Sequence, residues 1–415
     1  MTAFRVAIPA MDEPCSLPVT LNALAKQETA IPIETYVCVN QPESYWDNPD
    51  KYPICEHNSK TLEYLQHYDF LTLHILDYSS RGRGWKGKKF GVGYARKVLF
   101  ERILSDSNPE DIIVSLDADT YVKPNYLQSL ADNFSTNPAL NALAVPYYHE
   151  LVSGEELMNR ALLRYELYMR NYAINLLKIS SPYGFTALGS AIAMRAGALQ
   201  KIGNITPLQS GEDFYLVQKF SKMGGLGLFN TECVYPATRY SDRVPFGTGP
   251  AMLSGAKGAW DSYPIYHHRC FDAVQDAYGR LQELYEDCLS VKENDFLLFL
   301  QKDTRKKDIW ADIRHNVSDF DHFVKAFHQK ADGLRTLQYA RSKYKQNPVN
   351  EEVALYDNLC LWISEKVPAW FSPTRPFNFY SVDQLNSLRN LLFDQEQALR
   401  KEASSPFSVH SNETT

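Results

Sequence analysis

Residues 112–120, with the sequence IIVSLDADT, constrain the fold of this chain most strongly. Their β-branched and apolar start predicts a short buried strand over 112–116, and Asp117 and Asp119 follow at its C-terminal end. In an open α/β sheet, ligands bind outside the carboxyl ends of the strands. Two hard oxygen ligands there suit Mg²⁺ or Mn²⁺, which usually binds a substrate's phosphates as well. In a plainer alternative, Asp119 caps the next helix or both acids lie in a solvated turn.

The first half of the chain alternates between strand-like and helix-like patterns. Parallel strands need crossover connections, so this alternation predicts an α/β fold with a mostly parallel sheet flanked by helices. Residues 45–52 are rich in Pro, Asp and Asn and predict a loop, followed by a short helix over 61–67. The predicted strands cover residues 4–8, 34–39, 71–76, 112–116, 142–147 and 191–195.

The segment 81–96 contains five glycines and six cations in an otherwise acidic protein. Glycine gives the backbone freedom, and a basic, glycine-rich loop that leads into a helix can hold an anion. The segment lies just before the acid-bearing strand, which favours phosphate binding, because Arg and Lys would balance a diphosphate. The alternative is a mobile, solvated loop.

A second acid pair, Glu212 and Asp213, follows Gly211 and opens a predicted helix. Acids at a helix N-terminus are stabilised by the helix dipole, which is an innocent explanation. A carboxylate held there is also suited to accept a proton from a substrate hydroxyl. Further along, the Pro- and Gly-rich loop 239–250 offers Arg239 or Arg243 as a phosphate contact.

Composition excludes several classes of protein. The chain has 415 residues and a net charge of −6, so charge gives no case for nucleic acid as a partner. The seven cysteines are scattered without C-x-x-C spacing, which favours reduced thiols. No run approaches the roughly 20 apolar residues of a membrane span, and the N-terminus lacks a signal-peptide pattern. We therefore expect a cytoplasmic protein without a transmembrane segment, and a peripheral position at the inner face of the membrane is left open.

From Asp272 onward the pattern is helical, with apolar residues on one face of each segment and a final helix over 382–402. We expect a catalytic domain over residues 1–269, a helical C-terminal domain over 270–403 and a disordered tail over 404–415.

Taken in order, these motifs resemble glycosyltransferase family 2, over roughly residues 4 to 235. Residues 6–13 resemble the family's first strand and its Pro-x-x-Asn-Glu turn, with Asp12 where Asn is usual. The other matching positions are Gly87-Lys88-Lys89 with Ala95-Arg96, the D-x-D of Asp117-Ala118-Asp119, Gly189 with Arg195, and the E-D-x-x-L element of Glu212, Asp213 and Leu216.

The resemblance implies a GT-A fold, a Rossmann-like and mostly parallel sheet, here with a C-terminal helical extension. It implies transfer of a sugar from a UDP- or GDP-sugar to a hydroxyl acceptor, such as a glycan or glycolipid precursor. The implied catalytic residues are Asp213, as general base of an inverting reaction, and Glu212. Asp117, Asp119 and His268 are the implied ligands of Mn²⁺ or Mg²⁺. The expected donor-binding residues are Pro9, Asp12, Glu13, Asn40, Lys88, Lys89, Arg96, Asp117 and Arg243.

The chain departs from the family pattern in two places. The second strand ends in Asn40-Gln41, where the family commonly has acids that read the nucleotide. The Q-x-x-R-W element of processive members is absent, and residues 239–243 stand in the comparable place, which predicts transfer of a single sugar. The alternatives to a glycosyltransferase are a sugar nucleotidyltransferase and a non-catalytic protein that binds nucleotide or nucleic acid.

Overall fold

The computed structural model describes residues 2–87, 90–241, 243, 247–302 and 308–404. The predictions on Lys88, Lys89 and residues 405–415 of the tail lie outside this part of the chain. The chain forms two compact units, Met1–Asn159 with Thr186–Ala256, and Arg160–Phe185 with Lys257–Thr415. This division differs from the predicted boundary at residue 269, because residues 160–185 group with the C-terminal helices.

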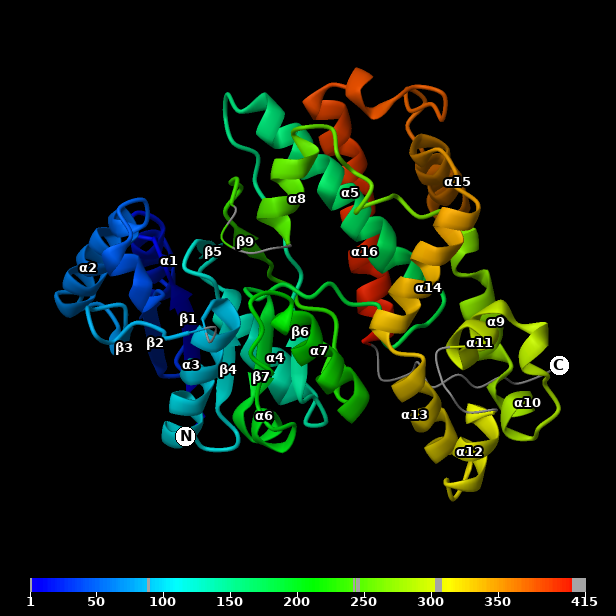
Figure 1. The fold of residues 1–415 in the computed structure, drawn as a ribbon, viewed down its shortest axis with the longest axis horizontal. Helices are drawn as coiled ribbons and strands as arrows, with labels where there is room; N and C mark the ends of the chain where they lie inside the picture. The colour runs from blue at the N-terminus through cyan, green and yellow to red at the C-terminus, as the bar shows by residue number, and fades with distance from the viewer. Residues whose placement is uncertain (1, 88–89, 242, 244–246, 303–307, 405–415) are drawn as a thin grey trace. The chain divides into compact units, whose positions relative to one another are not determined.

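The first unit contains the sheet and the helices around it (Figure 1). Its strands are β1 (Phe4–Ala10), β2 (Ile33–Asn40), β3 (Thr72–Tyr78), β4 (Ile112–Ser115), β5 (Thr120–Val122), β6 (Ala142–Ala144), β7 (Ile192–Arg195), β8 (Leu226–Gly227) and β9 (Val234–Pro236). Its helices are α1 (Ser16–Ala25), α2 (Tyr52–Gln66), α3 (Val92–Asp106), α4 (Tyr126–Thr136), α6 (Ala196–Lys201), α7 (Glu212–Met223) and α8 (Thr248–Gly255).

Seven strands form the main sheet in the order β3-β2-β1-β4-β7-β6-β8. β1 pairs in parallel with β2 and β4, β2 pairs in parallel with β3, and β7 runs antiparallel to β4 and β6. The inner strands β1 and β4 are buried along their whole length, as expected for a sheet covered on both faces. The predicted α/β class, with a mostly parallel sheet and a helical C-terminal region, is confirmed.

Two elements differ from the sequence-based prediction. α2 begins at Tyr52, so it takes in part of the segment that was predicted to be a loop, because Pro53 lies in the first helical turn, where proline is favoured. Its buried face includes Asn58 and Thr61. Because these residues are polar, they interrupt the helical spacing of apolar residues by which the helix would be recognised in the sequence. β5 and β9 form a separate antiparallel pair that the sequence did not predict, since each is only three residues long.

The second unit is helical. It contains most of α5 (Glu156–Lys178), and its other helices are α9 (Asp272–Gly279), α10 (Leu281–Tyr285), α11 (Asp295–Lys302), α12 (Ile309–His315), α13 (Phe320–Lys330), α14 (Gly333–Gln346), α15 (Glu351–Ile363) and α16 (Val382–Ala403). α5 and α16 lie side by side (Figure 1), joined by an ion pair of 2.8 Å between Arg170 and Glu396. On α15, the apolar residues Leu355, Leu359 and Trp362 are buried.

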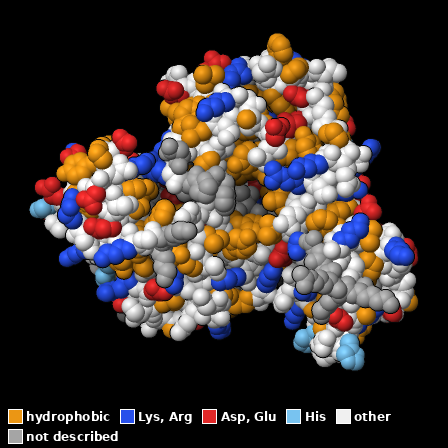
Figure 2. Space-filling view, viewed as in Figure 1, with side chains coloured by type: hydrophobic (Ala, Val, Ile, Leu, Met, Phe, Trp, Pro, Cys, Tyr) orange, Lys and Arg blue, Asp and Glu red, His pale blue; other side chains and the backbone are white. Residues whose placement is uncertain are grey.

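The surface carries mixed charge. On the face shown in Figure 2, Lys and Arg side chains are interspersed with acidic and apolar ones. None of the described helices combines the length and apolar character needed to cross a membrane.

Candidate active site

Arg96 joins the two acid pairs that the sequence singled out. It lies on α3, at the end of the glycine-rich segment 81–96, and is 3% exposed. Its guanidinium forms ion pairs with Asp117, which follows β4, and with Glu212, at the start of α7. Residues more than 100 positions apart therefore meet at one point, at the carboxyl end of β4. Arg96, from the end of the segment 81–96, thus brings the D-x-D and the second acid pair together.

The backbone at residue 189 makes room for this arginine. Gly189 has no side chain, and a Cβ atom there would overlap the guanidinium of Arg96. The Ser115 hydroxyl of β4 donates a hydrogen bond of 2.7 Å to the Gly189 carbonyl, which holds this turn against the strand. Arg195, the other residue in this part of the resemblance, pairs in register with Ile112 at the opposite end of β4. It therefore lies away from Asp117.

Asp213 adjoins this buried ion network in the first turn of α7. Its Oδ1 accepts a hydrogen bond of 2.7 Å from the Phe214 N–H. Burial, and then the neighbouring carboxylate of Glu212, raise the pKa of Asp213 to about 7, while Arg96 opposes the rise. A carboxylate with a pKa near neutrality is suited to general-base catalysis.

Asp119 pairs with an arginine from a distant part of the chain. The β5–β9 pair brings residues 234–239 alongside the D-x-D, and the Ala237 N–H donates to the Asp119 carbonyl over 3.1 Å. Arg239 Nη2 then lies 2.5 Å from Asp119 Oδ2. Burial is the largest cause that raises the pKa of Asp119 to about 6; Arg239 opposes the rise, and Asp117 and Glu13 add to it.

Glu13 lies on the other side of the same arginine. It is 5% exposed, and its Oε1 pairs with Arg239 Nη2 and, over 2.7 Å, with Arg243 Nη1. Arg243 also donates 2.6 Å to the Met11 carbonyl. Arg239 and Arg243 are therefore attached to the turn after β1, and Arg239 also to the D-x-D. The sequence offered Arg239 and Arg243 as phosphate contacts, but it gave no sign of their pairing with Glu13.

The ends of β1 and β2 hold a network of amide groups. The buried Asn40 side chain donates to the carbonyls of Ala10 and Cys38 over 3.0 and 3.3 Å and accepts from Trp85 Nε1 over 3.2 Å. Trp85 stacks on Tyr78, with ring centroids 4.3 Å apart. The sequence did not single out Trp85, although a tryptophan within a glycine-rich basic loop is a usable signal. Asn40 thereby positions an aromatic pair beside the strand ends.

The predicted turn residues Pro9 and Asp12 lie at the same sheet edge. Pro9 is in β1, opposite Cys38, and Asp12 has a φ of 62°, a conformation that is costly for a residue with a side chain. The Asp12 N–H donates a hydrogen bond of 2.9 Å to Asn58 Oδ1, and the Asp12 carboxylate lies 2.6 Å from His57 Nδ1. α2 thus supports the strained turn.

The first part of the glycine-rich segment is clamped by Glu43. Its carboxylate accepts from the N–H groups of Gly82 and Gly84 over 2.7 and 2.8 Å. Arg83 pairs with Asp77 over 3.2 Å, and Arg81 lies 3.4 Å from Asp47. These two cations of the predicted anion loop therefore already have acidic partners.

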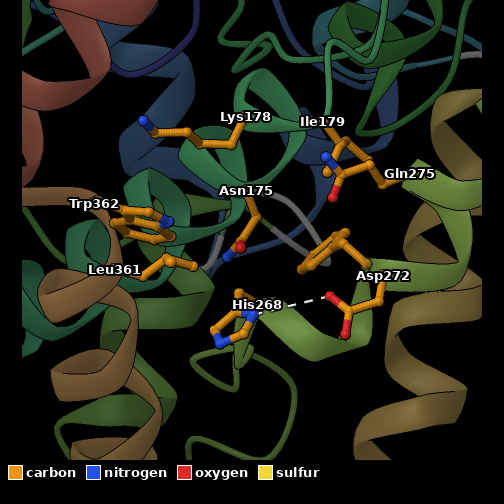
Figure 3. A pocket seen from close by; sticks show the side chains of 9 residues that line it. Asn175, Lys178, Ile179, His268, Asp272, Gln275, Leu361 and Trp362 are labelled. Atoms are coloured by element: carbon orange, nitrogen blue, oxygen red, sulfur yellow. Dashed lines mark ion pairs between the residues drawn. The ribbon is translucent and has the colours of Figure 1, made fainter. Parts of the chain in front are cut away.

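His268, predicted as a metal ligand, belongs to the second unit. It lines a cavity of about 310 Å³ (Figure 3), whose other walls include Asn175, Asp272 and Trp362. Its Nδ1 lies 3.9 Å from Asp272, and burial together with the adjacent His267 lowers the pKa of His268. Among the described residues, no group of three or more His, Cys, Asp or Glu side chains forms a metal site. A role for His268 in metal binding stays a prediction.

Residues 85–203 match the family model described as Glycosyl transferase family 2. The predicted resemblance is confirmed over these residues, which include Arg96, Asp117, Asp119 and Gly189. The mostly parallel sheet of the first unit is the arrangement that the resemblance implies for a GT-A fold. No curated protein sequence matches the chain.

Several solved structures are similar at low identity. Residues 1–349 of S. aureus TarS in complex with UDP-GlcNAc align with a TM-score of 0.41 and 15% identity, covering 90% of this chain and 98% of that one. A longer S. aureus TarS chain aligns with a TM-score of 0.38 and 15% identity over 83% of this chain, which spans only 54% of that one. The mannosyltransferase PcManGT from Pyrobaculum calidifontis, in complex with GDP-Man and Mn²⁺, aligns with a TM-score of 0.35 and 14% identity, covering 95% and 86% of the two chains.

Proposed function

Taking residues 85–203 as a segment of glycosyl transferase family 2, we propose that this protein is a glycosyltransferase. It moves a single sugar from a nucleotide-sugar to a hydroxyl acceptor, with inversion at the anomeric carbon. The observation that carries the proposal is the buried arginine Arg96, which ties the D-x-D acid Asp117 to Glu212 beside the proposed base. This contact keeps a donor-binding acid and the base-bearing helix at a fixed separation.

Asp213 is the proposed general base. The acceptor hydroxyl attacks the anomeric carbon, the bond from the sugar to the diphosphate breaks, and the hydroxyl proton passes to the Asp213 carboxylate. The pKa of about 7 supports this role, because the base is then ionised in half or more of the molecules at neutral pH without being too weak to accept the proton. Glu212 positions Arg96 and adds negative charge beside Asp213.

The leaving diphosphate needs positive charge. The carboxylates fit a hard divalent cation, because Glu13 Oε2 is buried and has no hydrogen-bond partner among the described residues. Burial also raises the pKa of Asp119 to about 6 against the opposing charge of Arg239, and Asp117 and Glu13 add to the rise. Asp117 and Asp119 would hold Mn²⁺ or Mg²⁺. When bound, the ion neutralises charge on the leaving group. Arg243, beside Glu13, supplies a further cation at this edge.

The proposed donor is a UDP- or GDP-sugar, and the proposed acceptor is a hydroxyl of a glycan or glycolipid precursor. The first unit carries all the proposed catalytic and donor-binding residues that the structure describes. We place the protein in the cytoplasm, in keeping with its scattered cysteines.

A thermal-shift panel of nucleoside diphosphates and nucleotide-sugars, with and without Mn²⁺, tests the donor class. A ligand that binds only the folded state raises the melting temperature, so one nucleotide family should stabilise the protein more with Mn²⁺ than without it. No shift across the panel, together with salt-sensitive oligonucleotide binding, would support a nucleic-acid-binding protein instead.

Two substitutions separate the proposed roles. Asp213→Asn should abolish sugar transfer and leave donor binding intact, whereas Asp119→Asn should remove the metal-dependent part of donor binding. Asp69→Asn, at an exposed position in the same unit, is the matched control and should change neither. Full transfer activity in the Asp213 variant would exclude it as the base.

A further inference from the structure

One guanidinium nitrogen bridges two acids in the proposed donor site. Arg239 Nη2 contacts both Glu13 Oε1 and Asp119 Oδ2. Glu13 follows β1 and Asp119 follows β4, and these two strands pair in parallel at the centre of the sheet. The cationic group of Arg239 therefore lies between carboxylates that follow two adjacent strands, and these two negative charges favour a positive charge there.

The remaining oxygen of Glu13 is also informative. Glu13 Oε2 is buried and finds no hydrogen-bond donor in the described part of the chain. A buried carboxylate oxygen without a partner is costly, so Arg239 and Arg243 satisfy only part of this acid. A divalent cation, which can bind several oxygen ligands at once, would satisfy both oxygens of Glu13.

We propose that Arg239 is an internal stand-in for the divalent cation of the donor site, and that Glu13 is a ligand of that cation together with Asp119. The inference rests on the proposed glycosyltransferase function and adds to it a mode of control. Without donor, Arg239 neutralises the Glu13–Asp119 pair. When a nucleoside diphosphate binds, its phosphates attract Arg239, and the carboxylates of Glu13 and Asp119 would then be available to hold the cation.

This exchange makes the binding of metal and nucleotide interdependent. Metal alone must compete with a tethered guanidinium, so its affinity is low. The diphosphate removes the competitor and supplies oxygens of its own, so each ligand raises the affinity for the other by the same factor. In this scheme Glu13 and Asp119 have a cationic partner both before and after the exchange.

The test measures Mn²⁺ binding by electron paramagnetic resonance or calorimetry, with and without UDP or GDP, on the full chain. In the wild type, the nucleotide that stabilises the protein should tighten Mn²⁺ binding by roughly 5- to 150-fold. Arg239→Gln should bind Mn²⁺ alone more tightly than the wild type and lose the part of this coupling that comes from displacing the arginine, so the coupling factor should be smaller than in the wild type. The effect of nucleotide on Mn²⁺ affinity is measured in the wild type, so this part of the test does not depend on whether a variant folds.

Arg243→Gln is the matched control for charge. Arg243 pairs with Glu13 over 2.7 Å and donates to the Met11 carbonyl, so its loss removes one positive charge from the same neighbourhood without vacating the contact with Asp119. It should tighten Mn²⁺ binding less than Arg239→Gln does. Equal effects of the two variants would overturn the stand-in role, because general electrostatics would explain both.

The ligand role of Glu13 is tested in the Arg239→Gln background, where the arginine no longer competes. Adding Glu13→Gln should weaken Mn²⁺ binding by roughly tenfold or more, and unchanged affinity would refute it. If the single variants leave Mn²⁺ binding unaltered while the wild type transfers sugar, the inference fails and the proposed function stands. If the wild type binds neither nucleotide nor Mn²⁺, both fail.

Discussion

Gly189 and Arg96 share one small space at the carboxyl end of β4: a Cβ atom on Gly189 would overlap the guanidinium that pairs with Asp117 and Glu212. The arginine is almost fully buried, so its charge depends on these two acids rather than on water. The absence of a side chain at one residue thus permits the contact on which the proposed site depends.

We expect Gly189→Ala to destabilise the first unit and impair donor binding. The added methyl group displaces Arg96 and leaves Glu212 as a buried, uncompensated charge, which typically costs about 3–5 kcal/mol. Urea unfolding measures the loss. Gly279→Ala is the control, because a Cβ atom at Gly279 meets nothing within 4 Å and the residue ends helix α9. Similar stability of the two variants would show that Arg96 can move without cost.

The pH dependence of transfer should report Asp213. Because burial and Glu212 raise its pKa to about 7, log kcat at saturating donor and Mn²⁺ should rise with pH up to about 7 and then level off. The rate rises with pH because only the ionised carboxylate can accept the hydroxyl proton. Initial rates between about pH 5 and 9 test this, with nucleotide binding measured over the same range as the control. A rate that stays flat down to pH 5 would contradict the assignment.

The same shift has a consequence for stability. The folded state binds the Asp213 proton more tightly than the unfolded chain, whose Asp pKa is about 3.9. The stabilisation from this group is therefore present below about pH 4 and is lost as the pH rises through about 7. Asp213→Asn should remove this pH-dependent component. As the pH rises from about 4 to about 7, the free energy of unfolding of the variant should therefore increase relative to that of the wild type.

Asn40→Asp should destabilise the protein, even though the family commonly has an acid at the end of this strand. The Asn40 amide donates to the carbonyls of Ala10 and Cys38, and a carboxylate would face both carbonyls without a proton to donate. The expected loss is about 1–3 kcal/mol, and more if the acid stays charged.

Asn48→Asp is the matched control for this change. Asn48 is exposed and accepts a hydrogen bond of 3.0 Å from the Asp50 N–H, a contact that aspartate reproduces. Melting temperatures compare the two variants. A loss at residue 48 as large as that at residue 40 would mean that the amide network at the strand ends contributes little.

Glu396→Gln should destabilise the second unit. Glu396 pairs with Arg170 over 2.8 Å and with Arg400 over 2.7 Å, and all three side chains are fully buried. Removing the charge breaks one buried contact of each of these two guanidinium groups, and a broken buried pair typically costs about 3–5 kcal/mol; Arg170 keeps its pair with Glu166 over 3.0 Å. Glu402→Gln, at an exposed position of the same helix, should change stability by less than about 0.5 kcal/mol. Urea unfolding of both variants tests the difference.

Local patterns in the sequence were enough for the fold class and for most of the first unit. The run 112–116 became β4 with both acids at its carboxyl end, and the helix opened by Glu212 and Asp213 is present as α7. Such features depend on the burial and spacing of neighbouring residues. α2 was too short in the prediction because its buried face is partly polar.

The sequence by itself determined the parallel sheet, the helical C-terminal region and the two acid pairs. Only the tertiary structure decided which arginine meets which acid: Arg96 with Asp117 and Glu212, and Arg239 with Asp119 and Glu13. Periodicity records which side of an element is buried, whereas these ion pairs depend on the path of the chain between residues that lie 21 to 226 positions apart. The grouping of α5 with helices beyond residue 257 has the same cause.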